Sequence, residues 1–369
     1  MDSLPQEIID EIIDNLTRST LRSSSLVAKR WRRRSQRRVL SKVTLSSESD
    51  VNKWHIDTQE GPGRIPSYVQ TAKFNHITRW NDPALFSRVL KNFSSLMRLW
   101  TYETEFPEEV LEYISNGGLG KNIIGLSLWS PRCSLTTAIS MIFTFPKLRN
   151  LVVDTFTTAS TKALPAHSIM PRRRPLDSLQ VVRNVAGVVQ TLANLQFTSR
   201  RLILDVQTTN IHKLLILSSV TVVELVLLGA CSLWGDRKHI SDDFIDDPDR
   251  QSPHLLDISP FPALNSLKIH ICGCYPSPQL VNTLSSISSA PALASIDLEC
   301  WWWFLSGSVP SGTWDRLDTW LARMAENAIV EGGLVLTLAR WEDNQGSRAL
   351  FPKFKGVSKI KTDPEGLDV

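Results

Sequence analysis

The sequence predicts an α/β protein in which a short all-helical segment is followed by alternating strands and helices. A short hydrophobic pattern recurs through most of the 369 residues, and helix-like stretches separate its copies. The first forty residues lack this pattern and instead combine an amphipathic helix with a strongly basic stretch. Strands that alternate with helices are typical of a parallel sheet, so we expect an α/β fold after the helical segment.

The first expected element is an amphipathic helix in the stretch LPQEIIDEIIDNL, residues 4–16. Its aliphatic residues recur at helical spacing on one side, and its acidic residues occupy the other side. Ser3 is expected to cap this helix, with Gln6 as its capping-box partner. Pro5 then falls in the first turn, where its missing N–H costs little.

Two more helices are expected before residue 42. The Ser/Thr cluster at 17–20 is interpreted as a turn between the first two helices, and the serines at 23–25 as a second break or cap. A three-helix unit this small rarely holds much core alone. We therefore expect it to lean on a partner, on the following domain, or on both.

The segment 29–42 is strongly basic. Eight of its fourteen residues are Lys or Arg, whereas the net charge of the whole chain is only +4. Three interpretations are open: a solvated helix face, a nuclear import patch, or contact with phosphate or RNA. No RNA-binding motif, zinc-finger spacing or interleaved aromatic residues accompany the run, which counts against nucleic acid.

The N-terminal segment resembles an F-box. It contains Leu-Pro, a Glu followed by a hydrophobic pair, a second hydrophobic pair, a short turn, and then Leu-Val, Lys and Trp. The residues in this order are Leu4, Pro5, Glu7, Ile8, Ile9, Ile12, Ile13, Leu16, Leu21, Leu26, Val27, Lys29 and Trp31. Ala28 stands where the family often has Cys or Ser.

The resemblance implies a surface that docks a Skp-type adaptor, which links to a cullin–RING ubiquitin ligase. The residues implied at this surface, or supporting it, are Leu4, Pro5, Ile8, Ile9, Ile12, Leu26, Val27 and Trp31. We expect Leu4, Pro5 and Ile8 to face the partner. Ile13 and Leu16 are expected to face inward, with Leu26 and Trp31 as their neighbours. The alternative is that the whole apolar side is ordinary core.

The recurring pattern has the form hydrophobic-x-x-hydrophobic-x-hydrophobic, and each copy is expected to be a short strand with its leucines facing inward. Ten copies have their middle positions at residues 72, 99, 126, 151, 179, 202, 225, 267, 296 and 336. Seven of the nine spacings fall between 23 and 29 residues, within the range of leucine-rich repeats. The spacing resembles divergent leucine-rich repeats and predicts a curved solenoid with a parallel sheet. A doubly wound sheet is the alternative.

These patterns divide the chain into an F-box-like three-helix domain at 1–45, a leucine-rich-repeat-like domain at 46–342 and a C-terminal tail at 343–369. Two long spacings hold insertions. One carries five aspartates between 242 and 249 without EF-hand spacing, and we expect an acidic loop there; a weak cation site or a contact for a basic partner is the alternative.

The second insertion carries three consecutive tryptophans, Trp301, Trp302 and Trp303. They cannot all point inward from a strand because neighbouring residues alternate faces. Exposed aromatic side chains are good binding anchors, so these tryptophans are possible target-binding residues. The alternative is that the C-terminal helix covers them.

We find no arrangement of residues for catalysis. The stretch NGGLGKN at 116–122 lacks the first Gly and the final Ser/Thr of a phosphate loop, and a turn is expected there instead. The CGC stretch at 272–274 is too closely spaced for a zinc site, and the seven histidines form no catalytic motif. We therefore expect no enzymatic activity, no cofactor and no metal.

Five cysteines without a C-x-x-C pair favour reduced thiols, and we see neither a signal-peptide pattern nor a membrane-spanning run. We expect a cytoplasmic and/or nuclear protein without membrane association. The leading hypothesis is a fungal-type F-box and leucine-rich-repeat substrate receptor of an SCF-type ubiquitin ligase, with an unidentified protein target. The alternatives are a repeat scaffold without a ligase link, and a nucleic-acid binder that uses 29–42.

Overall fold

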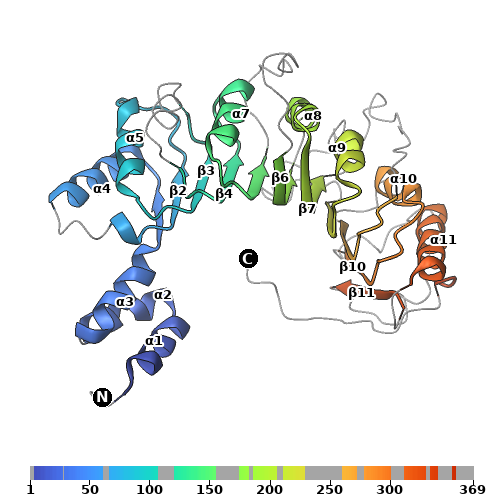
Figure 1. Ribbon diagram of the computed structural model, residues 1–369, viewed down its shortest axis with the longest axis horizontal. Helices are drawn as coiled ribbons and strands as arrows, with labels where there is room; N and C mark the ends of the chain where they lie inside the picture. The colour runs from blue at the N-terminus through green and yellow to red at the C-terminus, as the bar shows by residue number, and fades with distance from the viewer. Residues whose placement is uncertain are drawn as a thin grey trace. The chain divides into compact units, whose positions relative to one another are not determined.

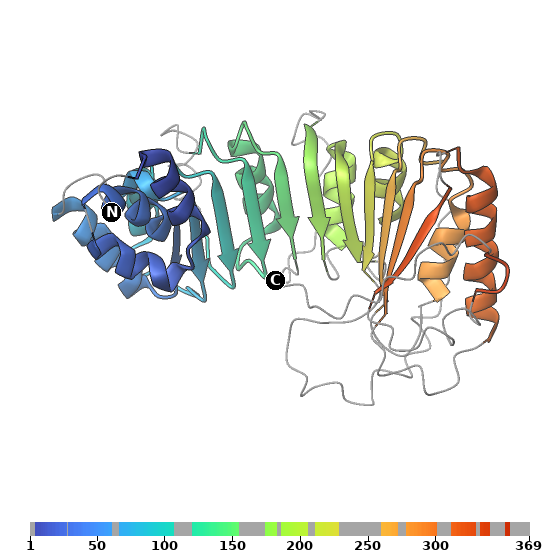
Figure 2. The same ribbon diagram turned by 90° about the horizontal axis from the view of Figure 1, so that it is seen from below.

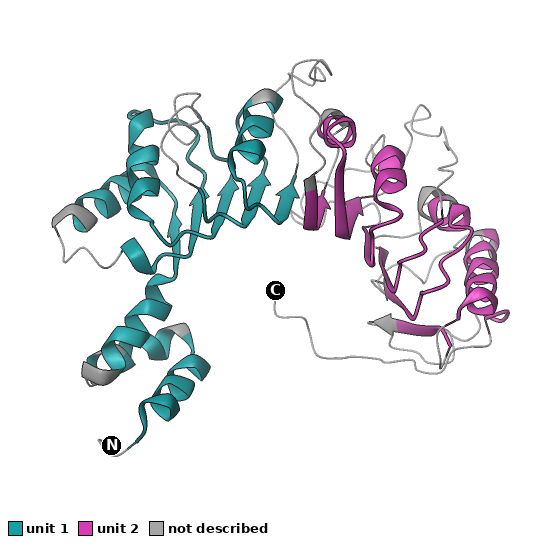
Figure 3. Ribbon diagram, viewed as in Figure 1, with its two compact units in different colours: residues 1–161 teal, residues 162–369 magenta. Residues whose placement is uncertain are grey.

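The chain forms two compact units, residues 1–161 and 162–369 (Figure 3). The division falls inside the segment expected to be one repeat domain. The computed structural model describes residues 4–27, 29–60, 66–106, 120–154, 174–182, 186–205, 211–228, 260–271, 278–300, 311–329, 333–339 and 351–354.

Three helices begin the first unit: α1 (Gln6–Asn15), α2 (Arg18–Val27) and α3 (Lys29–Leu40). The predicted capping box at α1 is wrong, because Pro5 occupies the N-cap position and no side chain caps the helix. The Gln6 amide instead donates to Asp10 at 2.8 Å.

The predicted break at the three serines is also wrong, because α2 runs through residues 23–25. The Ser24 hydroxyl donates to the carbonyl of Leu21 and shares a 3.0 Å hydrogen bond with the Ser35 hydroxyl on α3. Both serines are buried. A serine inside a helix usually competes with the backbone, whereas here the hydroxyl also ties two helices together.

The rest of the first unit alternates strands and helices in chain order (Figure 1). Its strands are β1 (Lys42–Leu45), β2 (Thr71–Asn75), β3 (Arg98–Tyr102), β4 (Gly125–Trp129) and β5 (Asn150–Val153). Its helices are α4 (Glu48–Glu60), the 3-10 helix η1 (Pro66–Tyr68), α5 (Pro83–Asn92) and α7 (Leu135–Thr144). Each strand pairs in parallel with the next. Neither β1 nor α4 was predicted from the sequence.

The second unit repeats this arrangement. Its strands are β6 (Arg174–Val181), β7 (Phe197–Asp205), β8 (Glu224–Leu228), β9 (Ser266–Ile271), β10 (Ser295–Cys300) and β11 (Val335–Ala339). Its helices are α8 (Ala186–Asn194), α9 (Ile211–Ser218), α10 (Pro278–Ser286) and α11 (Ser311–Asn327). Strand order again follows chain order, and all described pairs are parallel (Figure 2).

The middle positions of the predicted repeats are partners in the strand register. In the first unit Ala72, Leu99, Leu126 and Leu151 align across β2–β5. In the second unit the aligned residues are Leu179, Leu202, Leu225, Leu267, Ile296 and Leu336. All ten side chains are at most 1% exposed, so this column forms the centre of each core.

Within each unit the helices lie on one face of the strands and leave the other face without helices (Figure 1). A doubly wound sheet would reverse its strand order at a switch point and carry helices on both faces. The structure therefore confirms the predicted fold class, a helical N-terminal domain followed by a leucine-rich-repeat-like parallel arrangement, over the doubly wound alternative.

Candidate docking site on the N-terminal helices

The apolar side of α1 divides into a buried half and an exposed half. Ile9 and Ile13 are buried at 1% and 0% exposure, and they form a small core with Leu21 of α2. The partly buried side chains packed against this core are Leu16, Trp31 and Val39. Ile9 therefore lies in the domain's own core, and Trp31, which is partly exposed, packs against that core.

The exposed half of α1 consists of Leu4, just before the helix, with Ile8 and Ile12. We call these three residues the α1 stripe. Their exposed fractions are 36%, 42% and 36%. Ile8 and Ile12 are four residues apart and lie above one another on the helix, and Leu4 precedes the N-cap residue Pro5. Pro5 is exposed at the same end. Three large aliphatic side chains in a row facing solvent are what an interaction surface requires.

Leu26, on α2, is 79% exposed and is the second apolar feature of the domain. The expectation that Ile13 and Leu16 face Leu26 is wrong, because a side chain this exposed is no part of the core. Leu21, about one and a half turns earlier on α2, packs in the core with Ile13 instead. The side chain of Val27 lies outside the described residues.

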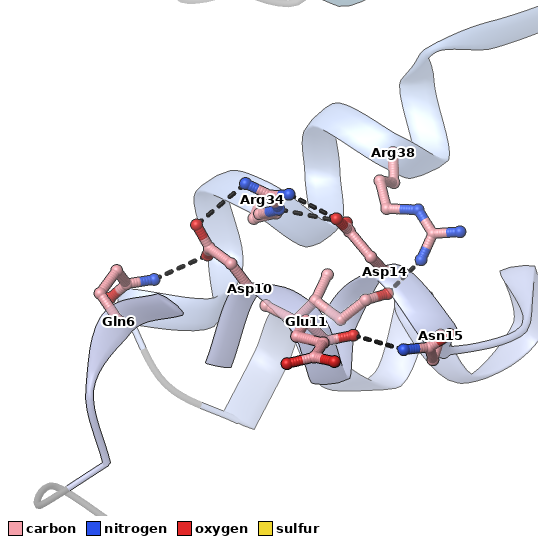
Figure 4. Close-up of polar contacts among 8 residues, drawn as sticks. Gln6, Asp10, Glu11, Asp14, Asn15, Arg34 and Arg38 are labelled. Carbon is pink, nitrogen blue, oxygen red and sulfur yellow. Dashed lines mark hydrogen bonds and ion pairs between the residues drawn. The ribbon is translucent and has the colours of Figure 1, made fainter. Parts of the chain in front are cut away.

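Arginines from α3 hold α1 in place (Figure 4). The Arg34 guanidinium donates to Asp10 at 2.9 Å and to Asp14 at 3.1 Å, and Arg38 donates to the backbone carbonyl of Ile13. The hydrogen bond from Arg34 lowers the pKa of the Asp14 carboxyl below its ordinary value. These contacts turn Asp10 and Asp14 toward α3, while the α1 stripe stays in solvent.

Replacing Arg34 with alanine is expected to return the Asp14 pKa toward its ordinary value, because the main group that stabilises the carboxylate is lost. The depressed pKa means that the ion pair stabilises the fold at neutral pH, and that this contribution disappears as the pH falls through the folded-state pKa, which lies below the ordinary value of an Asp carboxyl. An NMR titration of the Asp14 carboxyl measures this directly. Arg32→Ala is the control, because Arg32 is exposed on the same helix; an equal shift in both variants contradicts the assignment.

An open groove of about 850 Å³ lies beside these contacts. Its lining residues are Gln6, Asp10, Asp14, Arg33, Arg34, Arg37, Arg38, Ser41 and Gln70. Arg34 and Arg38 are engaged with α1, and Arg37 lies over the Tyr68 ring at 5.6 Å from its centre. Part of the basic run 29–42 therefore serves packing within the first unit, and Arg33 remains exposed.

The described residues contain no group of three or more His, Cys, Asp or Glu that could hold a metal ion. Burial raises the pKa of the Cys133 thiol to about 12, so this cysteine is a poor nucleophile at neutral pH. Gly120 belongs to the stretch 116–122, where a turn was expected in place of a phosphate loop. Its positive φ of 83° suits a turn, and a side chain at this position would collide with Phe145. No described helix combines the length and apolar character of a membrane span.

Several predicted features lie outside the described residues. They are Trp301, Trp302 and Trp303, the acidic insertion around 242–249, and the CGC stretch at 272–274. The structure instead reveals an aromatic group that the sequence analysis missed, namely Trp100, Tyr102 and Trp129 on β3 and β4. Trp100 occupies a variable position of the repeat pattern, and Tyr102 and Trp129 each directly follow a copy of it. Strand register makes Tyr102 and Trp129 neighbours.

The chain thus combines a small helical domain, which exposes aliphatic side chains of α1, with a series of strand–helix repeats. Residues 1–42 match the F-box domain family, so this segment is an F-box domain. F-box proteins are generally non-catalytic adaptors of SCF-type ubiquitin ligases. No curated protein is matched by the sequence. Among solved structures, the crystal structure of the Rad7 and Elc1 complex in yeast has a TM-score of 0.38 and 10% identity, covering 92% of this chain and 88% of that chain.

Proposed function

We propose that this chain is the substrate-recognition subunit of an SCF-type ubiquitin ligase. The F-box domain binds a Skp-type adaptor, and through it a cullin–RING ligase, using the α1 stripe, Pro5 and Leu26. The repeats bind a protein target. The observation that carries the proposal is the α1 stripe, because an F-box domain with three aliphatic residues in a solvent-facing row has an apolar surface available for a partner.

The chain's contribution is positional. A receptor that binds the adaptor at one end and the target elsewhere raises the effective concentration of target lysines near the charged conjugating enzyme. The ubiquitin-transfer chemistry belongs to other subunits, and this chain needs no cofactor for such a role. The free strand faces of the two units are suitable places for the target, since repeat proteins bind partners on extended surfaces of this kind.

Affinity purification followed by mass spectrometry tests the proposal. The wild-type chain is expected to recover a Skp-type adaptor, a cullin and at least one further protein. The triple variant Leu4→Ala/Pro5→Ala/Ile8→Asp is expected to lose the adaptor and the cullin, because the apolar surface is interrupted by a charge. Adaptor recovery by the triple variant at the wild-type level would refute the docking model.

A repeat scaffold without a ligase link is the second candidate. It is favoured by one observation: α3 contacts β1 and η1, so the N-terminal helices also abut the first repeat. In this case the helices would serve as a cap, and deleting residues 1–42 would unfold the first unit without loss of any adaptor. Circular dichroism of the deletion variant, combined with the purification above, separates the two candidates.

A further inference from the structure

The helix-free strand face of the first unit is cationic. The side chains on this face come from alternating residues of β1–β5, and we call it the unit 1 face. They are Lys42, Thr44, Thr71, Lys73, Asn75, Arg98, Trp100, Tyr102, Gly125, Ser127, Trp129, Asn150 and Val152. Three are cations and none is acidic. Lys42 on β1 and Arg98 on β3 both lie in register with Thr71 on β2. At a strand spacing of about 4.8 Å, their Cα atoms are therefore about 10 Å apart.

Neither Lys73 nor Arg98 forms an ion pair with a described residue. The Lys73 ammonium lies 4.2 Å from the centre of the Trp100 ring, which holds the lysine in place without neutralising it. The aliphatic stem of Arg98 lies over Gly125, where an added Cβ would stand 3.2 Å from the arginine Cγ. Two acids directly follow strands of this unit: Glu103, after β3, pairs with His76 at 3.1 Å, and Asp154, after β5, is buried.

Aromatic side chains accompany the cations. Tyr102 and Trp129 are direct partners in the register of β3 and β4, and Trp100 lies two residues before Tyr102 on the same strand. Tyr102 is 37% exposed, and both tryptophans are partly exposed. Trp, Tyr and Arg are the residues that contribute most to protein–protein binding. The unit 1 face therefore offers apolar anchors beside unpaired positive charge.

The corresponding face of the second unit differs. There Glu224 on β8 pairs with Arg201 at 3.1 Å and with Lys268 at 3.4 Å. These two cations are therefore neutralised from a neighbouring strand, and Asp297 adds a further acid on β10. The two units share one architecture, but Arg201 and Lys268 of the second have an ion-pair partner, whereas Lys73 and Arg98 of the first have none among the described residues.

We propose that the unit 1 face binds an acidic polypeptide segment, rich in Asp and Glu and carrying aromatic or aliphatic side chains. This inference rests on the proposed function and specifies the chemical class of its target. Carboxylates pair with Lys73 and Arg98, and the apolar residues of the segment contact Trp100, Tyr102 and Trp129. In an extended segment, alternate side chains are about 6.8 Å apart. The alternate residues along each strand of the unit 1 face have the same spacing.

A polypeptide fits the face better than single-stranded nucleic acid. Bases bind such surfaces by stacking on free aromatic rings. The Trp100 ring already carries the Lys73 ammonium, and the His76 ring packs edge-on against Tyr102 at 4.9 Å. Two of the three rings are thus partly covered, whereas carboxylates can reach the cations without displacing these contacts.

The test selects, from a library of random twelve-residue peptides, those that bind the full-length chain. The adaptor binding of each variant is measured in parallel. Selected peptides are expected to carry an excess of Asp and Glu. A selected peptide should bind Lys73→Ala/Arg98→Ala about tenfold more weakly or worse, because two charge-assisted contacts are lost. Binding should also weaken as salt is added. Arg201→Ala/Lys268→Ala, the matched pair on the second unit, should bind the peptide like the wild type.

Three results would overturn the proposal. The first is a selection without acidic enrichment. The second is unchanged peptide affinity in the Lys73→Ala/Arg98→Ala variant. The third is tighter binding of a twenty-nucleotide oligouridine, lost in that same variant, which would assign the face to RNA. If the wild-type chain does not bind the adaptor, that result counts against the proposed function alone, because peptide selection does not require the adaptor.

Discussion

Replacing Ile8 with aspartate is expected to lower the affinity of the chain for a Skp-type adaptor by at least about a hundredfold, or about 2.7 kcal/mol. Ile8 is the central residue of the α1 stripe and the most exposed of the three. An adaptor that covers the stripe must bury the new carboxylate against apolar surface, and burying an unpaired charge costs several kcal/mol. Titration calorimetry measures the loss.

The free chain is expected to tolerate the Ile8→Asp change, because the side chain already faces water. Ile13→Ala is the opposite case: Ile13 is fully buried, and its truncation should cost about 2–4 kcal/mol of the domain's stability. Gln36→Asp, at an exposed position of α3, controls for added charge. Equal adaptor affinity in Ile8→Asp and Gln36→Asp would show that the α1 stripe is not part of the adaptor interface.

Replacing Asp318 with alanine is expected to lower the free energy of unfolding of the second unit by about 2–4 kcal/mol. Asp318 lies on α11 with 0% exposure. Its two carboxylate oxygens accept hydrogen bonds from the backbone N–H groups of Lys353, at 2.8 Å, and Phe354, at 2.9 Å. Alanine leaves both donors without this acceptor and releases the segment 351–354 from the last repeat.

The same segment supplies a matched control. The Lys353 ammonium pairs with Asp315, one turn before Asp318 on α11, at 2.5 Å. Asp315 is 61% exposed, and an exposed ion pair contributes at most about 1 kcal/mol. The free energy of unfolding, measured by urea denaturation, should therefore be clearly lower in Asp318→Ala than in Asp315→Ala. Similar losses in the two variants would show that burial of the Asp318 carboxylate is unimportant.

Asp318 matters because it anchors two buried aromatic residues. Phe351 and Phe354 are 3% and 2% exposed, and the Phe351 ring packs edge-on against Trp314 at 5.8 Å. Both residues are held at α11, the last helix that the structure describes. Part of the tail expected at 343–369 thus packs against α11, and sequence inspection did not find this because the segment is short and lacks periodicity.

The repeat strands could be predicted because their inward residues follow a strict local rule. Leu99 and Leu126 are each the middle of a hydrophobic triplet, and their pairing follows from the spacing alone. The first strand, Lys42–Leu45, was missed because it directly follows the basic run and contributes only Val43 and Leu45 to the core. Periodicity identifies a repeating strand more readily than an initial one.

The candidate site was predictable only in part. Ile8 and Ile9 are adjacent and chemically identical, yet one is 42% exposed and the other 1%. The difference arises from the placement of α1 on α3, which depends on Arg34 and Arg38, twenty residues or more away in the chain. The unit 1 face is similar: Tyr102 and Trp129 are neighbours only through strand register, which no local pattern reveals.

The central claim is that the α1 stripe contacts an adaptor while the buried half of α1 holds the domain together. Site-specific photo-crosslinking tests it most directly, with a photoreactive residue at position 8 and, in a matched variant, at position 36 of α3. The proposed function predicts a covalent adduct with the adaptor from position 8 and none from position 36. An adduct from position 36 without one from position 8 would contradict the claim.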